Sequence, residues 1–245
     1  MSEKVTEEKG IEVWNNVLTA ALKVPGTKVN RDTYLKRELE QFYSAETVDY
    51  VIKNGLENSK VDKKVLDKIA KAVITYHTTI ATGLSFAAGL PGGWWIAATI
   101  PADLAQFYAQ IIIVAQKLAY IYGWGDFSSN EISDEYRNLI TLFIGVMSGA
   151  QAAEEGVKVV AEIAAKQVAK KLPQMALAKS AIYNVVKKVA TFIGIKMTKD
   201  SFAKGLSKAV PILGGVVSGT ITVATFGPMS KRLQKYLSSL PIAKI

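Results

Sequence analysis

The sequence predicts an all-α protein, a single multi-helix domain over residues 1–245 with about eight to ten helices. Three observations predict this fold class. Apolar residues recur about every three to four positions, which is the spacing of one helix face. No segment alternates as a half-buried strand would. Hydrophobic residues make up 49% of the 245 residues and only seven are proline, so the chain can bury a sizeable core.

Residues 1–58 predict three helices that pack on the rest of the domain. The first has its apolar stripe at Trp14, Val17, Leu18, Ala21 and Leu22 and ends at Pro25-Gly26. The second carries Leu35, Leu39 and Phe42 and begins after a cap at Asn30 or Asp32. The third runs from Ala45 to Asn54, with Val48, Val51 and Ile52 inward and a left-handed stop at Gly55.

The following residues predict five longer helices and a short amphipathic one. The fourth helix continues to Gly89 and is striped by Val61, Val65, Ile69, Val73, Tyr76 and Ile80. The fifth has Pro101 and Asp103 in its first turn and ends at Gly123. The next three span residues 133–148, 151–172 and 174–193, and Gly194 is expected to stop the last of them. The final helix carries the sequence KRLQKYL.

Two long segments, 72–102 and 209–230, carry no charge. The first is long enough to span a membrane, but Pro91, Gly92 and Gly93 interrupt it, and the second is also broken by glycine and proline. We therefore expect two helical hairpins rather than one clean span, either packed in a core or dipping into one leaflet. Trp94 and Trp95 are either interfacial anchors or aromatic side chains that fill the core.

Polar residues share one face of the fifth predicted helix, which is otherwise apolar: Asp103, Gln106, Gln110 and Lys117. Two interpretations are open. These residues line a polar groove for a ligand such as a lipid headgroup, or they satisfy neighbouring polar groups inside the core. His77, the only histidine, comes one helix earlier, and antiparallel packing would bring it near this face. A lone histidine in an apolar run is typical of a hydrogen-bonded core residue.

The net charge of +9 is concentrated between Lys158 and Lys208, where eleven lysines accompany two acids. This segment predicts an anionic partner. The use of lysine rather than arginine, and the few aromatic residues, favour a lipid surface over nucleic acid. The alternative is that these lysines are the solvated faces of several helices. The predicted basic face comprises Lys166, Lys170, Lys171, Lys187, Lys188, Lys199, Lys204 and Lys208.

Little in the sequence predicts catalysis, and the composition favours a non-enzymatic protein. There is no cysteine and one histidine, which argues against disulfides, thiolate chemistry and a zinc site. No Walker A, HExxH, GxSxG or kinase motif occurs, and no cofactor or metal is expected. A hydrolase that uses Asp103 is the least supported hypothesis. The polar N-terminus lacks the apolar core of a secretory signal.

Two blocks of the sequence resemble a known family. GLPGGWWIAATIPADLAQFYAQIIIVAQKLAYIYG, residues 89–123, closely resembles the signature of the bacterial EcsC protein family, with its Gly-Leu-Pro-Gly turn, Pro-Ala-Asp helix start and Tyr-Gly helix end. KAVPILGGVVSGTITVATFGPMSKRLQKYL, residues 208–237, is similar to the second signature. The likeness covers roughly residues 60–240. It implies an all-helical bacterial protein, and the family is named through an operon that also encodes an ABC transporter. The motif residues are Pro91, Gly92, Gly93, Pro101, Tyr122, Gly123, Pro211, Gly214 and Gly215.

Together these features predict a non-enzymatic, membrane-associated protein that binds a lipid surface or a lipid molecule through apolar hairpins and a Lys-rich face. The candidate lipid-binding residues are Trp94, Trp95, Asp103, Gln106, Gln110 and His77. The expected location is the cytoplasm, peripheral to the inner face of the membrane. The alternative is a soluble scaffold or adaptor that binds a membrane protein complex such as a transporter. The oligomeric state stays open.

Overall fold

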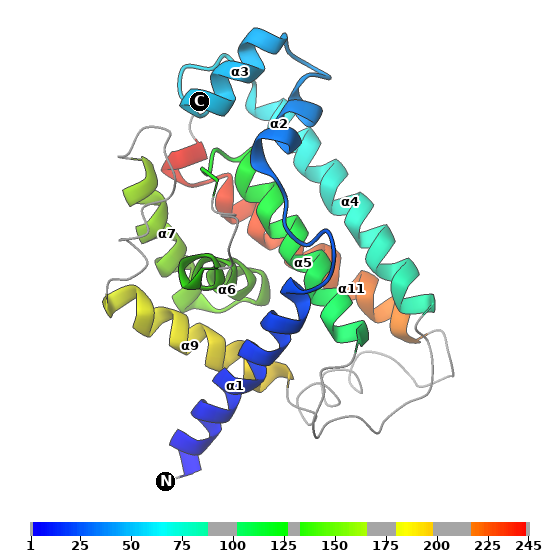
Figure 1. The fold of residues 1–245 in the computed structure, drawn as a ribbon, viewed down its shortest axis with the longest axis vertical. Helices are drawn as coiled ribbons and strands as arrows, with labels where there is room; N and C mark the ends of the chain where they lie inside the picture. Colours follow the sequence, from blue (N-terminus) through cyan, green and yellow to red (C-terminus); the bar gives the residue numbers. More distant parts are fainter. Residues whose placement is uncertain (1, 88–101, 127–132, 166–179, 198–216, 244–245) are drawn as a thin grey trace.

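Helices form nearly all of the regular structure. The structure, a computed structural model, describes residues 2–87, 102–126, 133–165, 180–197 and 217–243. Within these ranges the chain forms nine α-helices and one short 3-10 helix, and none of these residues lies in a strand, which confirms the all-α prediction. The helices are α1 (Ser2–Leu22), α2 (Arg31–Leu39), α3 (Ala45–Asn54), α4 (Lys63–Ala87), α5 (Ala102–Ile121), α6 (Asp134–Ser148), α7 (Gln151–Ala165), α9 (Ser180–Met197), α11 (Val217–Leu237) and the 3-10 helix η1 (Pro241–Ala243) (Figure 1).

Local caps fix several helix ends where the sequence predicted them. The Asn30 side chain accepts a hydrogen bond from the Thr33 backbone amide (2.8 Å) at the start of α2. Gly55 ends α3 with a φ of 85°, but its ψ of −166° lies outside the left-handed helical region that we predicted. Glycine adopts this backbone conformation because it has no Cβ. The predicted helix boundaries near residues 172 and 174 lie outside the described residues.

Two large side chains predicted on inner helix faces lie at the surface instead. Tyr76 is 60% exposed on α4, and Phe42 is 39% exposed beyond the end of α2. The buried face of α4 runs through Leu66, Val73 and His77. Ile69 and Val73 of the predicted row are buried, so the row follows the inner face through Val73. It leaves that face at Tyr76, three residues on, whereas the buried face continues four residues on, at His77.

A pair of glycines forms the crossing point of α1 and α9. A Cβ at Gly194 would overlap the backbone of Gly10, and a Cβ at Gly10 would lie 3.1 Å from the Thr191 carbonyl oxygen. The prediction that Gly194 stops its helix is wrong, because α9 continues to Met197. The glycine instead lets two helix backbones approach closely.

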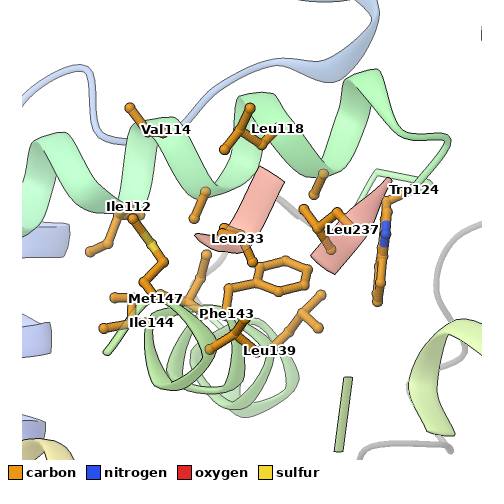
Figure 2. Packing of buried hydrophobic residues seen from close by; sticks show 14 of the residues in the cluster. Ile112, Val114, Leu118, Trp124, Leu139, Phe143, Ile144, Met147, Leu233 and Leu237 are labelled. Atoms are coloured by element: carbon orange, nitrogen blue, oxygen red, sulfur yellow. The ribbon is translucent and has the colours of Figure 1, made fainter. Parts of the chain in front are cut away.

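The central helix of the fold is α5, which contacts α1, α2, α4, α6 and α11. Figure 2 shows Leu233 and Leu237 of α11 in the space between α5 and α6, with Leu118 of α5 nearby. Trp124 meets the ring of Phe143 edge-on, with ring centroids 5.0 Å apart. One hydrophobic cluster includes residues of every α-helix named above, as expected of a single domain.

α5 is also the one described helix that is long and apolar enough to cross a membrane, over Leu104–Ile121 with a mean hydropathy of 1.3. Inside the fold, 67% of this segment is buried. The core therefore accounts for its apolar character, because a buried helix needs the same composition as a membrane span.

α4, α5 and α11 lie side by side and meet at one end of the molecule. α4 and α5 run antiparallel, so segment 72–102 is not one continuous helix, as predicted, and α11 runs antiparallel to α4 along its length. The C-terminal end of α4 and the N-terminal ends of α5 and α11 lie together at the lower right of Figure 1. Both long uncharged segments of the sequence therefore connect to this end.

Candidate functional site

The structure describes only part of the predicted site. The residues that lie outside the described ranges are Trp94, Trp95, Pro91, Gly92, Gly93, Pro101, Pro211, Gly214 and Gly215, together with Lys166, Lys170, Lys171, Lys199, Lys204 and Lys208 of the basic face. Asp103 belongs to the first turn of α5, and its side chain is also outside the description. Lys187 and Lys188 are exposed on α9. The remaining candidates lie between α4 and α5.

His77, Gln110 and Lys117 form a hydrogen-bonded chain between these two helices. His77 Nδ1 lies 2.8 Å from Gln110 Oε1, and Lys117 Nζ lies 2.9 Å from His77 Nε2. An ammonium group only donates, so Nε2 is the acceptor and the ring proton lies on Nδ1, which donates to Gln110. His77 therefore lies where antiparallel packing was expected to bring it. Gln106 is half-buried one turn before Gln110.

This environment keeps His77 neutral. Burial, and then the charge of Lys117, lower the pKa of His77 from 6.5 to about 4, against the opposing effect of the Gln110 hydrogen bond. Both ring nitrogens have partners, so neither is free to take a proton from a substrate. The arrangement is that of a hydrogen-bonded core histidine, as is typical of a lone histidine in an apolar run.

Lys117 is held without a carboxylate partner among the described residues. Its Nζ lies 5.4 Å from the centroid of the Tyr34 ring, and the guanidinium of Arg37 lies 5.7 Å from the same ring. Burial, and then the charge of Arg37, lower the pKa of Lys117. An imidazole and an aromatic ring thus contact the ammonium group of Lys117, which agrees with the interpretation that this polar face satisfies neighbouring groups inside the core.

Tyr122, a residue of the predicted motif, joins three helices. Its hydroxyl donates to Asp67 Oδ1 of α4 (2.7 Å) and accepts from Gln234 Nε2 of α11 (3.3 Å). Gly123 follows with a φ of 89°, and a Cβ there would lie 2.5 Å from the Ile242 carbonyl oxygen. Only glycine fits this helix end without displacing the chain.

These contacts set the relative level of α4, α5 and α11. Tyr122 holds Asp67 level with Gln234, and further toward the common end a Cβ at Gly227 of α11 would lie 3.8 Å from Thr78 Oγ1 of α4. Because α4 runs antiparallel to α5 and α11, these pairs show which residues of the three helices lie at the same height along the bundle. By this count three charged residues lie at about one level: Lys71 on α4, Lys117 on α5 and Lys231 on α11.

Beyond that level the three helices carry no charge over residues 72–87, 104–116 and 217–230, which we call the charge-free end. At 1.5 Å per residue these stretches are about 24, 20 and 21 Å long. Asp103, which precedes the second stretch, is the one formal charge that these helices carry further toward the tip. Three separate sequence segments therefore form one uncharged part of the molecule.

The outer face of α4 within the charge-free end is exposed, although it is uncharged. Thr75, Tyr76 and Thr79 all reach solvent. The hydroxyls of Thr78, Thr79 and Thr82 each donate to the backbone carbonyl four residues earlier, at 2.7 to 3.1 Å. A hydroxyl that is hydrogen-bonded to its own helix keeps that bond outside water. The free-energy cost of moving this face out of water is therefore small.

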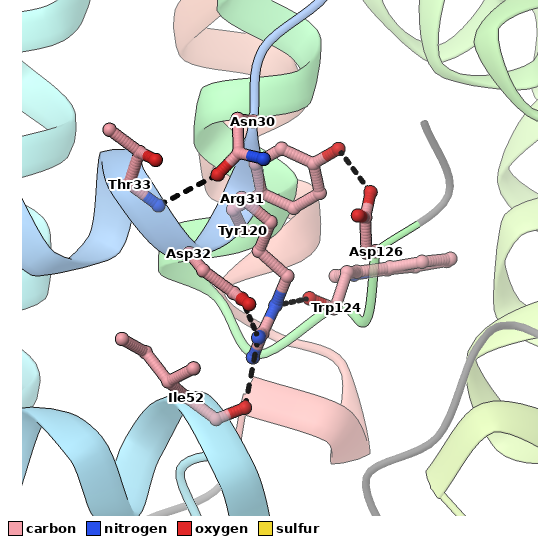
Figure 3. A network of polar contacts seen from close by, with 8 residues as sticks. All are labelled: Asn30, Arg31, Asp32, Thr33, Ile52, Tyr120, Trp124 and Asp126. Carbon is pink, nitrogen blue, oxygen red and sulfur yellow. Dashed lines mark hydrogen bonds and ion pairs between the residues drawn. The ribbon is translucent and has the colours of Figure 1, made fainter. Parts of the chain in front are cut away.

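Arg31 was not among the predicted site residues, but it fastens α2 and α3 to the end of α5 (Figure 3). Its Nε donates to the Trp124 carbonyl (3.0 Å), and its Nη1 donates to the Ile52 carbonyl (3.0 Å) and to Asp32 (3.0 Å). The side chain is only 8% exposed. The two carbonyls that it joins, of Trp124 and Ile52, come from remote parts of the chain, so local sequence gave no signal for this role.

Gln116, fully buried in α5, was also missed. Its Nε2 donates to the carbonyls of Thr27 (2.7 Å) and Ile112 (3.1 Å), and its Oε1 accepts from the Val29 amide (3.2 Å). This side chain holds the connection between α1 and α2 against α5. The signal was visible as an isolated polar residue in the apolar run IIIVAQ, since a buried amide requires partners.

A hollow of about 370 Å³ lies where α6 ends, α7 begins and α9 passes. Gln151, Lys188 and Phe192 are among the residues that line it. It is shallow and open to solvent, so a lipid molecule in it would stay exposed. The hollow therefore supports a lipid molecule as ligand less well than the charge-free end supports a lipid surface.

Comparison with known proteins identifies no relative of this chain. No protein-family model, curated protein or solved structure matches it. The functional hypothesis therefore depends on the geometry of the molecule itself.

Proposed function

We propose that the protein is a peripheral membrane protein that inserts its charge-free end into one leaflet of a lipid bilayer. The observation that carries this proposal is the common level at which α4, α5 and α11 lose their charges. A surface designed for water intersperses charged residues over all of its faces. Here three packed helices lack charge toward the same end, with Asp103 at the start of α5 as the one exception, although α4 exposes part of its surface there.

The dimensions of the charge-free end suit one leaflet. The hydrocarbon core of a bilayer is about 30 Å thick, so one leaflet contributes about 15 Å. Helical stretches of about 20 to 24 Å reach through one leaflet when they tilt, but they are too short to cross the whole core. Lysine is costly to move into hydrocarbon, so insertion would stop at the level of Lys71 and Lys231.

The chain attached to this end supports the same function. Residues 88–101 connect α4 to α5 and carry no charge, and they include Trp94 and Trp95. Tryptophan is enriched where proteins meet the membrane–water interface. We therefore propose both as interfacial anchors. The polar residues His77, Gln110 and Lys117 satisfy one another, so a headgroup is not required to explain them.

The proposed location is the inner face of a bacterial cytoplasmic membrane. The similarity of residues 89–123 and 208–237 to the EcsC signatures supports this location, and we propose membership of that family on the same basis. The Lys-rich face, of which Lys187 and Lys188 are described, stays a second proposed contact with anionic lipid.

Flotation with neutral phosphatidylcholine vesicles tests the proposed insertion, because neutral lipid isolates the apolar contribution. We expect the protein to float with the vesicles and Trp94→Ala/Trp95→Ala protein to bind more weakly. Thr79→Lys places a charge on the exposed face of the charge-free end and should abolish flotation. Thr33→Lys, on the exposed surface of α2 at the other end of the molecule, is the matched control and should float normally.

Two results would overturn the proposal. Wild-type protein that stays with the aqueous fraction would favour the soluble scaffold instead. Equal flotation of the Thr79→Lys and Thr33→Lys proteins would show that binding uses another surface.

A further inference from the structure

Where the charge-free end joins the body of the protein, the charges that border it are all positive, whereas Asp103 lies at its opposite limit. After Asp67, α4 carries two cations and no acid before the charge-free end begins, and α11 contains no acid at all. The bordering cations are Lys68 and Lys71 on α4, Lys117 on α5, and Lys231, Arg232 and Lys235 on α11. Ordinary solvated helices mix both signs, so this one-sided set indicates an anionic partner.

All of these cations except the half-buried Lys117 are exposed. We call four of them, Lys68, Lys71, Lys231 and Lys235, the boundary cations. In the part of the chain that the structure describes, none of the four forms an ion pair. The other two are hydrogen-bonded to the protein itself: Lys117 donates to His77 (2.9 Å), and the exposed Arg232 donates to the Met147 carbonyl (2.7 Å). The boundary cations are therefore the ones that can meet a partner.

We infer that the boundary cations bind the headgroups of anionic phospholipids and so set the depth to which the charge-free end inserts. This inference rests on the proposed function. With the charge-free end in hydrocarbon, the register of α4 and α11 brings these lysines to the headgroup level. The aliphatic part of a lysine lies along the apolar zone while its ammonium group reaches a phosphate. The anion-binding residues are then on α4 and α11, and not only on the predicted basic face, of which Lys187 and Lys188 lie on α9.

A pair of charge variants tests the inference on two kinds of vesicle, phosphatidylcholine alone and phosphatidylcholine with phosphatidylglycerol, at physiological salt. Lys71→Gln/Lys231→Gln removes two boundary cations that are exposed, so the fold should persist, which circular dichroism checks. Lys53→Gln/Lys60→Gln removes the same charge from exposed positions in and after α3, at the far end of the molecule (Figure 1). At physiological salt, charges that far from the surface are screened.

The expected loss for the boundary variant is about 5-fold in affinity per lysine, or about 25-fold together, on the anionic vesicles alone. Its affinity for neutral vesicles should not change, and the Lys53→Gln/Lys60→Gln control should bind both kinds of vesicle like wild type. An equal loss in the control would overturn the inference, since overall charge would then be responsible.

The failure of the inference differs from the failure of the proposed function. Wild-type binding that is equally strong on both kinds of vesicle would contradict headgroup binding while leaving insertion intact. Absence of binding to either kind would contradict insertion itself, and headgroup binding with it.

Discussion

His77 shows how burial and one neighbouring cation set the chemistry of a side chain. Its pKa is about 4 in the folded protein, and in an unfolded chain a histidine titrates near 6.5. As the pH falls below about 6.5, the unfolded chain binds the proton before the folded protein does. The part of the unfolding free energy that depends on neutral His77 is therefore fully present above about pH 6.5, and it is lost as the pH falls toward about 4.

His77→Gln should remove this pH dependence. Glutamine can donate to Gln110 and accept from Lys117, but it does not titrate. Between about pH 6.5 and 4, wild-type protein should lose about 3 kcal/mol more of its unfolding free energy than the variant, measured by urea unfolding. Because the chain has one histidine, proton NMR can follow its titration directly. A midpoint near 6.5 would contradict the buried position bonded to Lys117.

Gly194→Ala should weaken the crossing of α1 and α9. The added methyl group would overlap the Gly10 backbone, so the helices must separate, at a cost of about 1–3 kcal/mol. Gly83→Ala is the matched control, because the space around its Cβ position is open and alanine favours a helix by about 0.5–1 kcal/mol. Thermal unfolding followed by circular dichroism compares the two variants. Equal stability would mean that the helices do not cross so closely.

At the scale of the element, α4 shows which part of a helix its own sequence can predict. Apolar spacing predicted that α4 exists and that it continues far beyond Tyr76. It predicted the inner face correctly at Ile69 and Val73 but not in the following turn, where Tyr76 is exposed and His77 takes the buried position. A polar side chain lies inside only because Gln110 and Lys117 on α5 receive it, and that pairing is a property of two helices.

Some helix ends could likewise be predicted from the sequence and others could not. The start of α2 was predictable because Asn30 caps the backbone only three residues away. The continuation of α9 through Gly194 was not, because the reason for that glycine is Gly10 on α1. Contacts within a few residues can be inferred from sequence, whereas contacts between remote helices cannot.

Arg31→Lys should loosen the attachment of α2 and α3. Lysine lacks the planar, forked guanidinium with which Arg31 reaches both the Trp124 and the Ile52 carbonyl. A buried carbonyl left without a donor costs about 1–3 kcal/mol. Arg37→Lys is the control, because Arg37 is exposed and its ion pair with the adjacent Glu38 is worth at most about 1 kcal/mol. Hydrogen exchange should show faster opening confined to α2 and α3 in the Arg31 variant. Equal effects of the two substitutions would contradict the anchoring role.

For the molecule as a whole, the decisive feature is the alignment of three uncharged stretches. The sequence showed that the segments 72–102 and 209–230 lack charge, but not that their limits coincide in space. That alignment depends on the contacts of Tyr122 with Asp67 and Gln234, which join helices remote in sequence. Composition alone also could not separate core from membrane for α5, because both environments select the same apolar residues.

Site-directed spin labelling measures the proposed insertion most directly. The chain has no cysteine, so Thr79→Cys and Lys64→Cys each provide a single labelling site, and both positions are exposed on α4. On vesicles, we predict that a label at Thr79 becomes accessible to oxygen and protected from a water-soluble nickel chelate, while a label at Lys64 stays accessible to the chelate. Equal access of the chelate to both labels on vesicle-bound protein would contradict insertion of the charge-free end.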